Sequence, residues 1–89
     1  MEKWQALKTE LRKLAKVIFD SSQEVVQLES HRESDLKARL ISGTKDMELE
    51  YLPERDVVRW ETPDEYGFER IPENPGQLAR QLIGWVRKR

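Results

Sequence analysis

Residues 36–51 constrain the fold of this chain most strongly, because they can pair with themselves in only one register. A turn at Gly43-Thr44 brings apolar residues together on one face of a hairpin and opposite charges together on the other. The apolar pairs are Leu40 with Met47, Ala38 with Leu49 and Leu36 with Tyr51, and the charged pairs are Arg39 with Glu48 and Lys37 with Glu50. A slip of one residue would set apolar side chains against charges, and glycine at the first turn position suits a type II′ hairpin. The sequence therefore predicts two antiparallel strands in this register.

Two further turns extend this sheet towards the C-terminus. Proline at Pro53 and Pro63 is typical of connections, because proline cannot donate a hydrogen bond inside a paired strand. Turns centred on residues 54–55 and on Asp64 give the pairs Tyr51 with Val58, Leu49 with Trp60, Glu50 with Arg59, Trp60 with Phe68 and Arg59 with Glu69. These registers predict an inward face that consists of Met47, Leu49, Tyr51, Val58, Trp60, Tyr66 and Phe68. The outward face is then a lattice of alternating charges.

Residues 21–34 carry conflicting signals. Ser21 followed by Glu24 fits a capping box of a helix, whereas Val25-Val26 and the alternation that follows favour a strand. A loop centred on Glu33 would set Leu28 opposite Ala38, Val26 opposite Leu40, Glu29 opposite Lys37 and Val25 opposite Ile41. We therefore predict a strand over residues 23–30, with a helix as the alternative.

Apolar side chains predict a helix at each end of the chain. Over residues 1–20 they recur at steps of three and four, at Trp4, Leu7, Leu11, Leu14 and Ile18, which predicts an amphipathic helix. The same spacing fits a coiled-coil seam, so pairing with another helix is the alternative to packing on the sheet.

The last helix is predicted to begin at Asn74-Pro75. Asparagine is a good N-cap and proline suits the first helical position. Its apolar stripe consists of Leu78, Ala79, Leu82, Ile83 and Val86. Gly84 inside this helix costs about 1 kcal/mol relative to alanine, and close packing against the sheet or the first helix would explain it.

Together these elements predict one α+β domain over residues 1–89. We expect a two-layer sandwich in which an N-terminal helix, a four- to five-stranded antiparallel β-meander and a C-terminal helix follow one another, with both helices on one sheet face. Its core should include Trp4, Leu11, Leu49, Trp60 and Leu82. The chain has no cysteine, which excludes disulfides, thiolate chemistry and zinc sites built on cysteine sulfur, and no apolar run near the ~20 residues that span a bilayer. A cytoplasmic protein without a membrane partner is expected.

No recognised catalytic spacing is present. His31 is the only histidine and lies in a polar run between two expected strands, without the partner groups that a general base needs. An acidic cluster, formed by Glu61, Asp64, Glu65, Glu69 and Glu73, leaves cation binding open, although it lacks the alternating ligands and central glycine of a calcium loop. We therefore predict no enzymatic activity and assign no catalytic, cofactor-binding or metal-ligating residue.

The expected surface suggests two kinds of function. Under the registers above, Leu52, Val57 and Ile71 form a row on the otherwise charged outward face, and a continuous apolar row predicts a protein-binding or dimer surface. This favours a small non-catalytic protein-interaction module, either a homodimer or an adaptor. The alternative is a nucleic-acid-binding protein that uses the basic terminal helices, with phosphate contacts from Arg80, Arg87, Lys88 and Arg89. Residues 74–89 contain four basic and no acidic residues, whereas residues 46–73 contain ten acidic and three basic ones.

Overall fold

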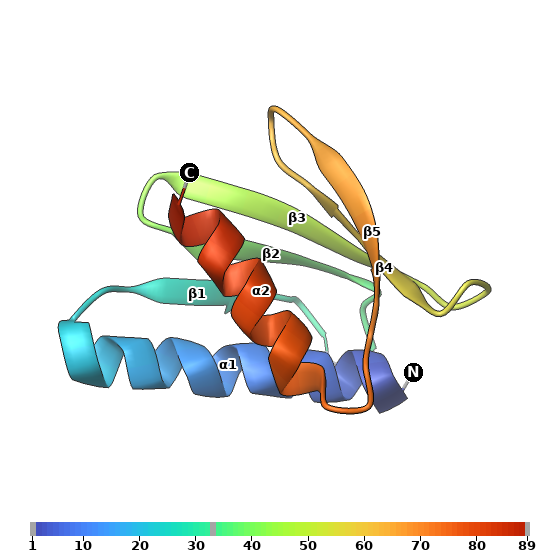
Figure 1. The fold of residues 1–89 in the computed structure, drawn as a ribbon, viewed down its shortest axis with the longest axis horizontal. Coiled ribbons are helices and arrows are strands. Elements are labelled where there is room, and N and C mark those ends of the chain that lie inside the picture. Colours follow the sequence, from blue (N-terminus) through green and yellow to red (C-terminus); the bar gives the residue numbers. More distant parts are fainter. Residues whose placement is uncertain (1, 33, 89) are drawn as a thin grey trace.

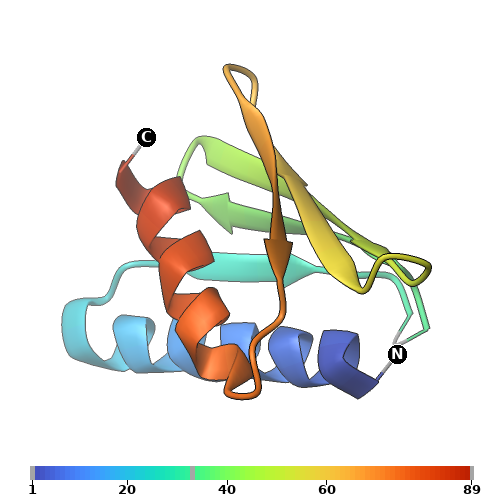
Figure 2. The ribbon, with the colours of Figure 1, turned by 45° about the vertical axis from the view of Figure 1, so that its right-hand side comes forward.

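The predicted order of helix, antiparallel sheet and helix is confirmed by a computed structural model, which describes residues 2–32 and 34–88 (Figure 1). The elements are α1 (Glu2–Ser22), β1 (Val26–Glu29), β2 (Lys37–Ser42), β3 (Lys45–Leu52), β4 (Val57–Glu61), β5 (Tyr66–Arg70) and α2 (Pro75–Lys88). The strands form a five-stranded sheet in the order β1-β2-β3-β4-β5. Both helices pack on the same face, with α1 beside β1 and α2 across β2 and β3 (Figures 1 and 2). We call this covered side the inner face of the sheet.

The central part of the sheet has the predicted register. Leu40 lies opposite Met47 and Arg39 opposite Glu48, and Tyr51 donates its backbone N–H to the carbonyl of Leu36 at 2.7 Å. Gly43 has a φ of 65° while Thr44 has no positive φ, which is the combination found in a type II′ turn. The pairing of β3 with β4 is also confirmed, since Leu49 lies opposite Trp60 and Tyr51 opposite Val58.

The connection from α1 to β1 differs from the prediction in its bounds. Ser21 does not open a helix, because α1 continues to Ser22 and both serine hydroxyls donate to the carbonyl of Ile18, at 3.3 and 2.8 Å. Gln23 then ends the helix with a φ of 63°, and its N–H donates to the carbonyl of Phe19 at 2.8 Å. A left-handed residue is a common way to end a helix. The strand prediction is confirmed only for the shorter segment β1.

The predicted register of β1 on β2 is wrong by two residues. Leu28 lies opposite Leu40 and not Ala38, and Val26 lies opposite Ser42. The loop between the strands is wider than predicted because Asp35 organises it: its carboxylate accepts the N–H of Arg32 at 3.0 Å. A shift of two residues keeps the same side chains on the inner face. The predicted loop centre, Glu33, lies outside the described residues.

The predicted register of β4 on β5 is wrong by one residue. Phe68 lies opposite Arg59, and Gly67 lies opposite Trp60. The turn spans residues 62–65 and is closed by Thr62, whose N–H donates to the carbonyl of Glu65 at 2.9 Å. A shift of one residue moves every side chain of a strand to the other face. Tyr66 and Phe68, predicted inward, are therefore exposed, and Ile71, predicted outward, is buried.

Gly67 explains why β5 takes this register. A Cβ atom at this position would lie 2.6 Å from Cζ2 of the Trp60 indole, so the indole fills the space of the missing side chain. The indole also contacts Trp85, with ring centroids 5.2 Å apart. Trp60 therefore lies at the margin of the core, whereas Trp4, Leu11, Leu49 and Leu82 are buried as predicted.

The start of α1 is fixed to the sheet by stacking and by polar contacts. Trp4 stacks on Tyr51 with ring centroids 5.9 Å apart and an interplanar angle of 10°, and its indole N–H donates to the carbonyl of Asp35 at 2.7 Å. The Tyr51 hydroxyl donates to Asp56 at 2.5 Å, and Lys3 donates to the same carboxylate at 3.2 Å. The hydrogen bond between Tyr51 and Asp56 lowers the pKa of Asp56 and raises that of Tyr51. The stripe of α1 is thus used within the chain, against the sheet and α2.

The start of α2 is as predicted, but the role proposed for Gly84 is wrong. The side chain of Asn74 accepts the N–H of Gly76 at 3.0 Å, which is the expected N-cap, and Pro75 is the first helical residue. A Cβ atom at Gly84 would meet nothing within 4 Å. No close packing requires glycine there.

These two glycines should respond oppositely to the same substitution. Gly84→Ala should stabilise the protein by about 1 kcal/mol, because it removes the glycine penalty of a helix without a clash. Gly67→Ala should destabilise it by about 1–3 kcal/mol, because the new methyl group must displace an indole held by Trp85. Urea denaturation of both variants beside the wild type measures the difference. Equal effects of the two substitutions would contradict this account of Gly67.

Candidate interaction surface

The row predicted on the outward face is not formed. Leu52 and Val57 do lie opposite each other on the outer face and are half-buried. Ile71 is only 4% exposed and belongs to the core, because the one-residue difference in the register of β5 turns it inward. Ile71 therefore does not belong to an exposed surface.

The same difference creates another exposed group, which we call the β5 aromatic patch and define as Arg59, Tyr66 and Phe68. Tyr66 is 63% exposed and Phe68 46% exposed, and their rings meet edge to face with centroids 6.2 Å apart. The guanidinium of Arg59 lies 5.3 Å from the centre of the Tyr66 ring. Val57, which lies two residues before Arg59 on the same face of β4, continues the patch towards Leu52.

Arg59 is held in place by a carboxylate. It donates to Glu61 at 2.9 Å, and this hydrogen bond raises the pKa of the guanidinium above its ordinary value. The cation thus stays over the aromatic ring while its charge is balanced by a neighbour on the same strand. Aromatic residues and arginine are the side chains most enriched at the centres of protein interfaces.

The backbone beside the patch is also open to a partner. β5 is the last strand of the sheet, with β4 as its one neighbour within the described part of the chain. The tip of the β4–β5 hairpin projects beyond the rest of the molecule in both views (Figures 1 and 2). An edge strand presents unpaired N–H and C=O groups that can pair with another chain. The unpaired backbone edge of β5 therefore lies next to the face on which Tyr66 and Phe68 are exposed.

The sequence contained a signal for this patch that pattern matching missed. The predicted register placed Trp60 opposite Phe68, which is a favourable aromatic pair. It gave no structural reason for a glycine at position 67. A glycine inside a strand often marks a place where another group approaches closely. Here that group is the indole of Trp60, and pairing Trp60 with Gly67 gives the observed register.

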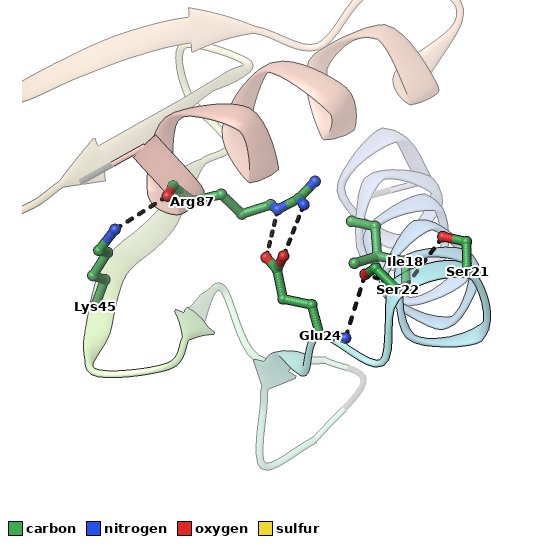
Figure 3. A network of polar contacts seen from close by, with 6 residues as sticks. All are labelled: Ile18, Ser21, Ser22, Glu24, Lys45 and Arg87. Atoms are coloured by element: carbon green, nitrogen blue, oxygen red, sulfur yellow. Dashed lines mark hydrogen bonds and ion pairs between the residues drawn. The ribbon is translucent and has the colours of Figure 1, made fainter.

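The basic residues assigned to nucleic-acid binding do not all point to a free surface. Arg87 donates to both carboxylate oxygens of Glu24, at 2.6 and 2.9 Å (Figure 3). Its backbone carbonyl accepts Lys45 at 3.1 Å, so the end of α2 is joined to the segment before β1 and to β3. Arg80 and Lys88 are exposed on α2, and Arg89 lies outside the described residues.

The residues considered for chemistry lie on the surface. His31 is exposed and borders a hollow of about 640 Å³ where β1 and β2 separate, together with Glu29, Lys37 and Arg39. Over residues 2–32 and 34–88, no three His, Asp or Glu side chains lie close enough together to hold a metal ion. Within the same residues, no helix has the length and apolar character needed to cross a membrane.

Comparison with other proteins does not place the chain in a family. No family model, curated protein sequence or solved structure matches it.

The contact between Glu24 and Arg87 should make stability depend on pH. The hydrogen bond from Arg87 lowers the pKa of Glu24 below its ordinary value of 4.5. A carboxyl group whose pKa is lowered in the folded state stabilises the protein above its unfolded pKa, and this stabilisation is lost as the pH falls through the folded pKa. Wild type should therefore exceed Glu24→Gln in unfolding free energy above pH 4.5, with the difference shrinking at lower pH.

Urea denaturation at a series of pH values measures this difference. Glu54→Gln is the matched control, since Glu54 is exposed in the turn after β3. A constant difference between wild type and Glu24→Gln across the series would show that the ion pair contributes nothing to the pH profile.

Proposed function

We propose that this protein is a small non-catalytic interaction module that forms a homodimer by pairing β5 of one copy with β5 of a second copy. The observation that carries the proposal is the coincidence of an uncovered edge strand with two exposed aromatic side chains, Tyr66 and Phe68. Edge strands in monomeric proteins are usually blunted by charge, proline or a cover. On β5 the outward positions are instead aromatic at two of three sites.

The sequence of β5 is complementary to itself in one antiparallel register. Phe68 is the middle residue of this five-residue strand, so pairing centred on it uses the whole strand. Phe68 then faces Phe68 of the partner subunit, and Tyr66 faces Arg70 of the partner subunit. Directly opposed side chains on one face are about 4.5–5.5 Å apart at Cβ, which suits an aromatic pair and a cation–π contact. Twofold symmetry repeats the second contact.

The side chains on the inner face are also compatible with this pairing of the two β5 strands. Gly67 would face Glu69 of the partner subunit, so the two carboxylates do not meet. A register shifted by two residues towards the C-terminus would instead oppose the two copies of Glu69, and like charges directly opposite one another are destabilising. Charge therefore favours the centred register.

The expected dimer is weak. Stable interfaces generally bury about 800 Å² per partner, and one pair of five-residue strands buries less. Association should therefore depend on protein concentration, as in transient complexes.

Analytical ultracentrifugation over a concentration series tests the proposal with two matched variants. Phe68→Glu should abolish the dimer, because it places two carboxylates on the symmetry axis, while Phe19→Glu should leave it intact. The two phenylalanines are 46% and 45% exposed, so the same substitution is made at equal exposure on β5 and on α1. Both variants should keep a cooperative thermal transition.

A wild type that stays monomeric at every concentration would refute the homodimer. Equal loss in the two variants would refute the role of β5. If a different protein pairs with β5 in place of a second copy, Phe68→Glu abolishes that complex without a change in the mass of the free protein.

Nucleic-acid binding through Arg80, Arg87, Lys88 and Arg89 stays a prediction. It would require Arg87 to leave Glu24 or to act through its remaining donors. A gel shift at low salt separates it from the dimer, because phosphate binding falls steeply with salt and does not depend on Phe68.

A further inference from the structure

The opposite edge of the sheet carries a second open feature, a groove between α1 and β1. The helix runs alongside the strand (Figures 1 and 2), and the groove between them has a volume of about 700 Å³. Its apolar lining includes Ala15, Phe19, Val25 and Leu28. Phe19 and Val25 are 45% and 52% exposed, so two sizeable apolar side chains border the groove without a cover.

The strand in this groove has an open backbone edge. β1 is the first strand of the sheet and pairs with β2 alone among the described strands. In an antiparallel pair, alternate residues direct their N–H and C=O groups away from the neighbouring strand. An extended chain is the shape that can satisfy such a row of donors and acceptors.

Charge along the groove is uneven. Lys16 and Arg12 line it from α1 and are both exposed, and Glu29 lines it from the end of β1. Phe19, Lys16 and Arg12 succeed one another along one side of the helix, at spacings of three and four residues. The groove is therefore apolar at the end near Phe19 and Val25. Its charged lining consists of two cations, Lys16 and Arg12, and one carboxylate, Glu29, and so has an excess of one positive charge.

We propose that this groove binds an extended acidic peptide, which adds to the free edge of β1 as a further strand. Strand addition beside a helix combines backbone hydrogen bonds, which give affinity, with pockets for alternate side chains, which give specificity. The alternate residues that face α1 would be an apolar residue against Phe19 and Val25, and then carboxylates against Lys16 and Arg12. This site lies at the edge of the sheet opposite β5 and does not require the dimer.

Fluorescence anisotropy with a labelled synthetic peptide tests the proposal. The probe is a short peptide with one leucine followed at alternate positions by two glutamates, with threonine between them, made in both sequence orders. Saturable binding is expected in one order, and the same peptide with lysine in place of glutamate should bind at least about tenfold more weakly, since opposed charges become like charges.

Variants of the protein then locate the site. Lys16→Glu and Phe19→Ala should each weaken binding by about five- to tenfold, as expected for loss of one charge contact or one apolar contact. Lys13→Glu and Val17→Ala are the matched controls on the side of α1 that faces α2, and they should bind as wild type does. Phe68→Glu should also bind the peptide normally, which separates this site from the β5 dimer.

Three results would overturn the proposal. The first is no saturable binding of the acidic peptide in either order, and the second is equal binding of the lysine peptide. The third is a Phe19→Ala variant that no longer self-associates but still binds the peptide. This result would identify a second copy of this chain as the occupant of the groove.

Discussion

The contact between Trp60 and Gly67 determines which side chains of β5 are exposed to solvent. The indole occupies the space in which a side chain at residue 67 would lie, so glycine must face inward at that position. Side chains alternate along a strand, and Tyr66 and Phe68 must then face outward. The exposed aromatic residues are thus a consequence of packing on the inner face of the sheet. The contact also joins the sheet to α2, since the same indole rests against Trp85.

The register of the central strands could be predicted because side-chain pairs on both faces of the sheet specify it. A shift of one residue in β2 or β4 relative to β3 would have broken apolar pairs on one face and charged pairs on the other. Arg39 illustrates the second face, since it does contact Glu48 at 3.1 Å. Exposed ion pairs contribute only about 0–1 kcal/mol each, so their value here is mainly that they identify the register.

The outer strands could not be placed by the same reasoning, for two different reasons. Leu28 meets an apolar residue whether it lies opposite Ala38 or Leu40, and the choice depends on hydrogen bonds of the loop at Asp35. For β5, pairing Trp60 with Phe68 satisfied every rule of side-chain pairing but ignored the volume of the indole. The error in the register of β5 also misplaced the candidate surface. Ile71 directly follows β5, so it turns to the inner face when the register shifts by one residue.

The topology also has a consequence for how the chain reaches this structure. Every strand pairs with the next one along the chain, so the sheet is built from local contacts, which form quickly. The packing of α1 against α2 joins opposite ends of the sequence, and closing so long a loop carries a larger entropic cost. During synthesis α2 emerges after all five strands. The part of the inner face over β2 and β3 therefore stays open to water, and to other chains, until the last helix has been made.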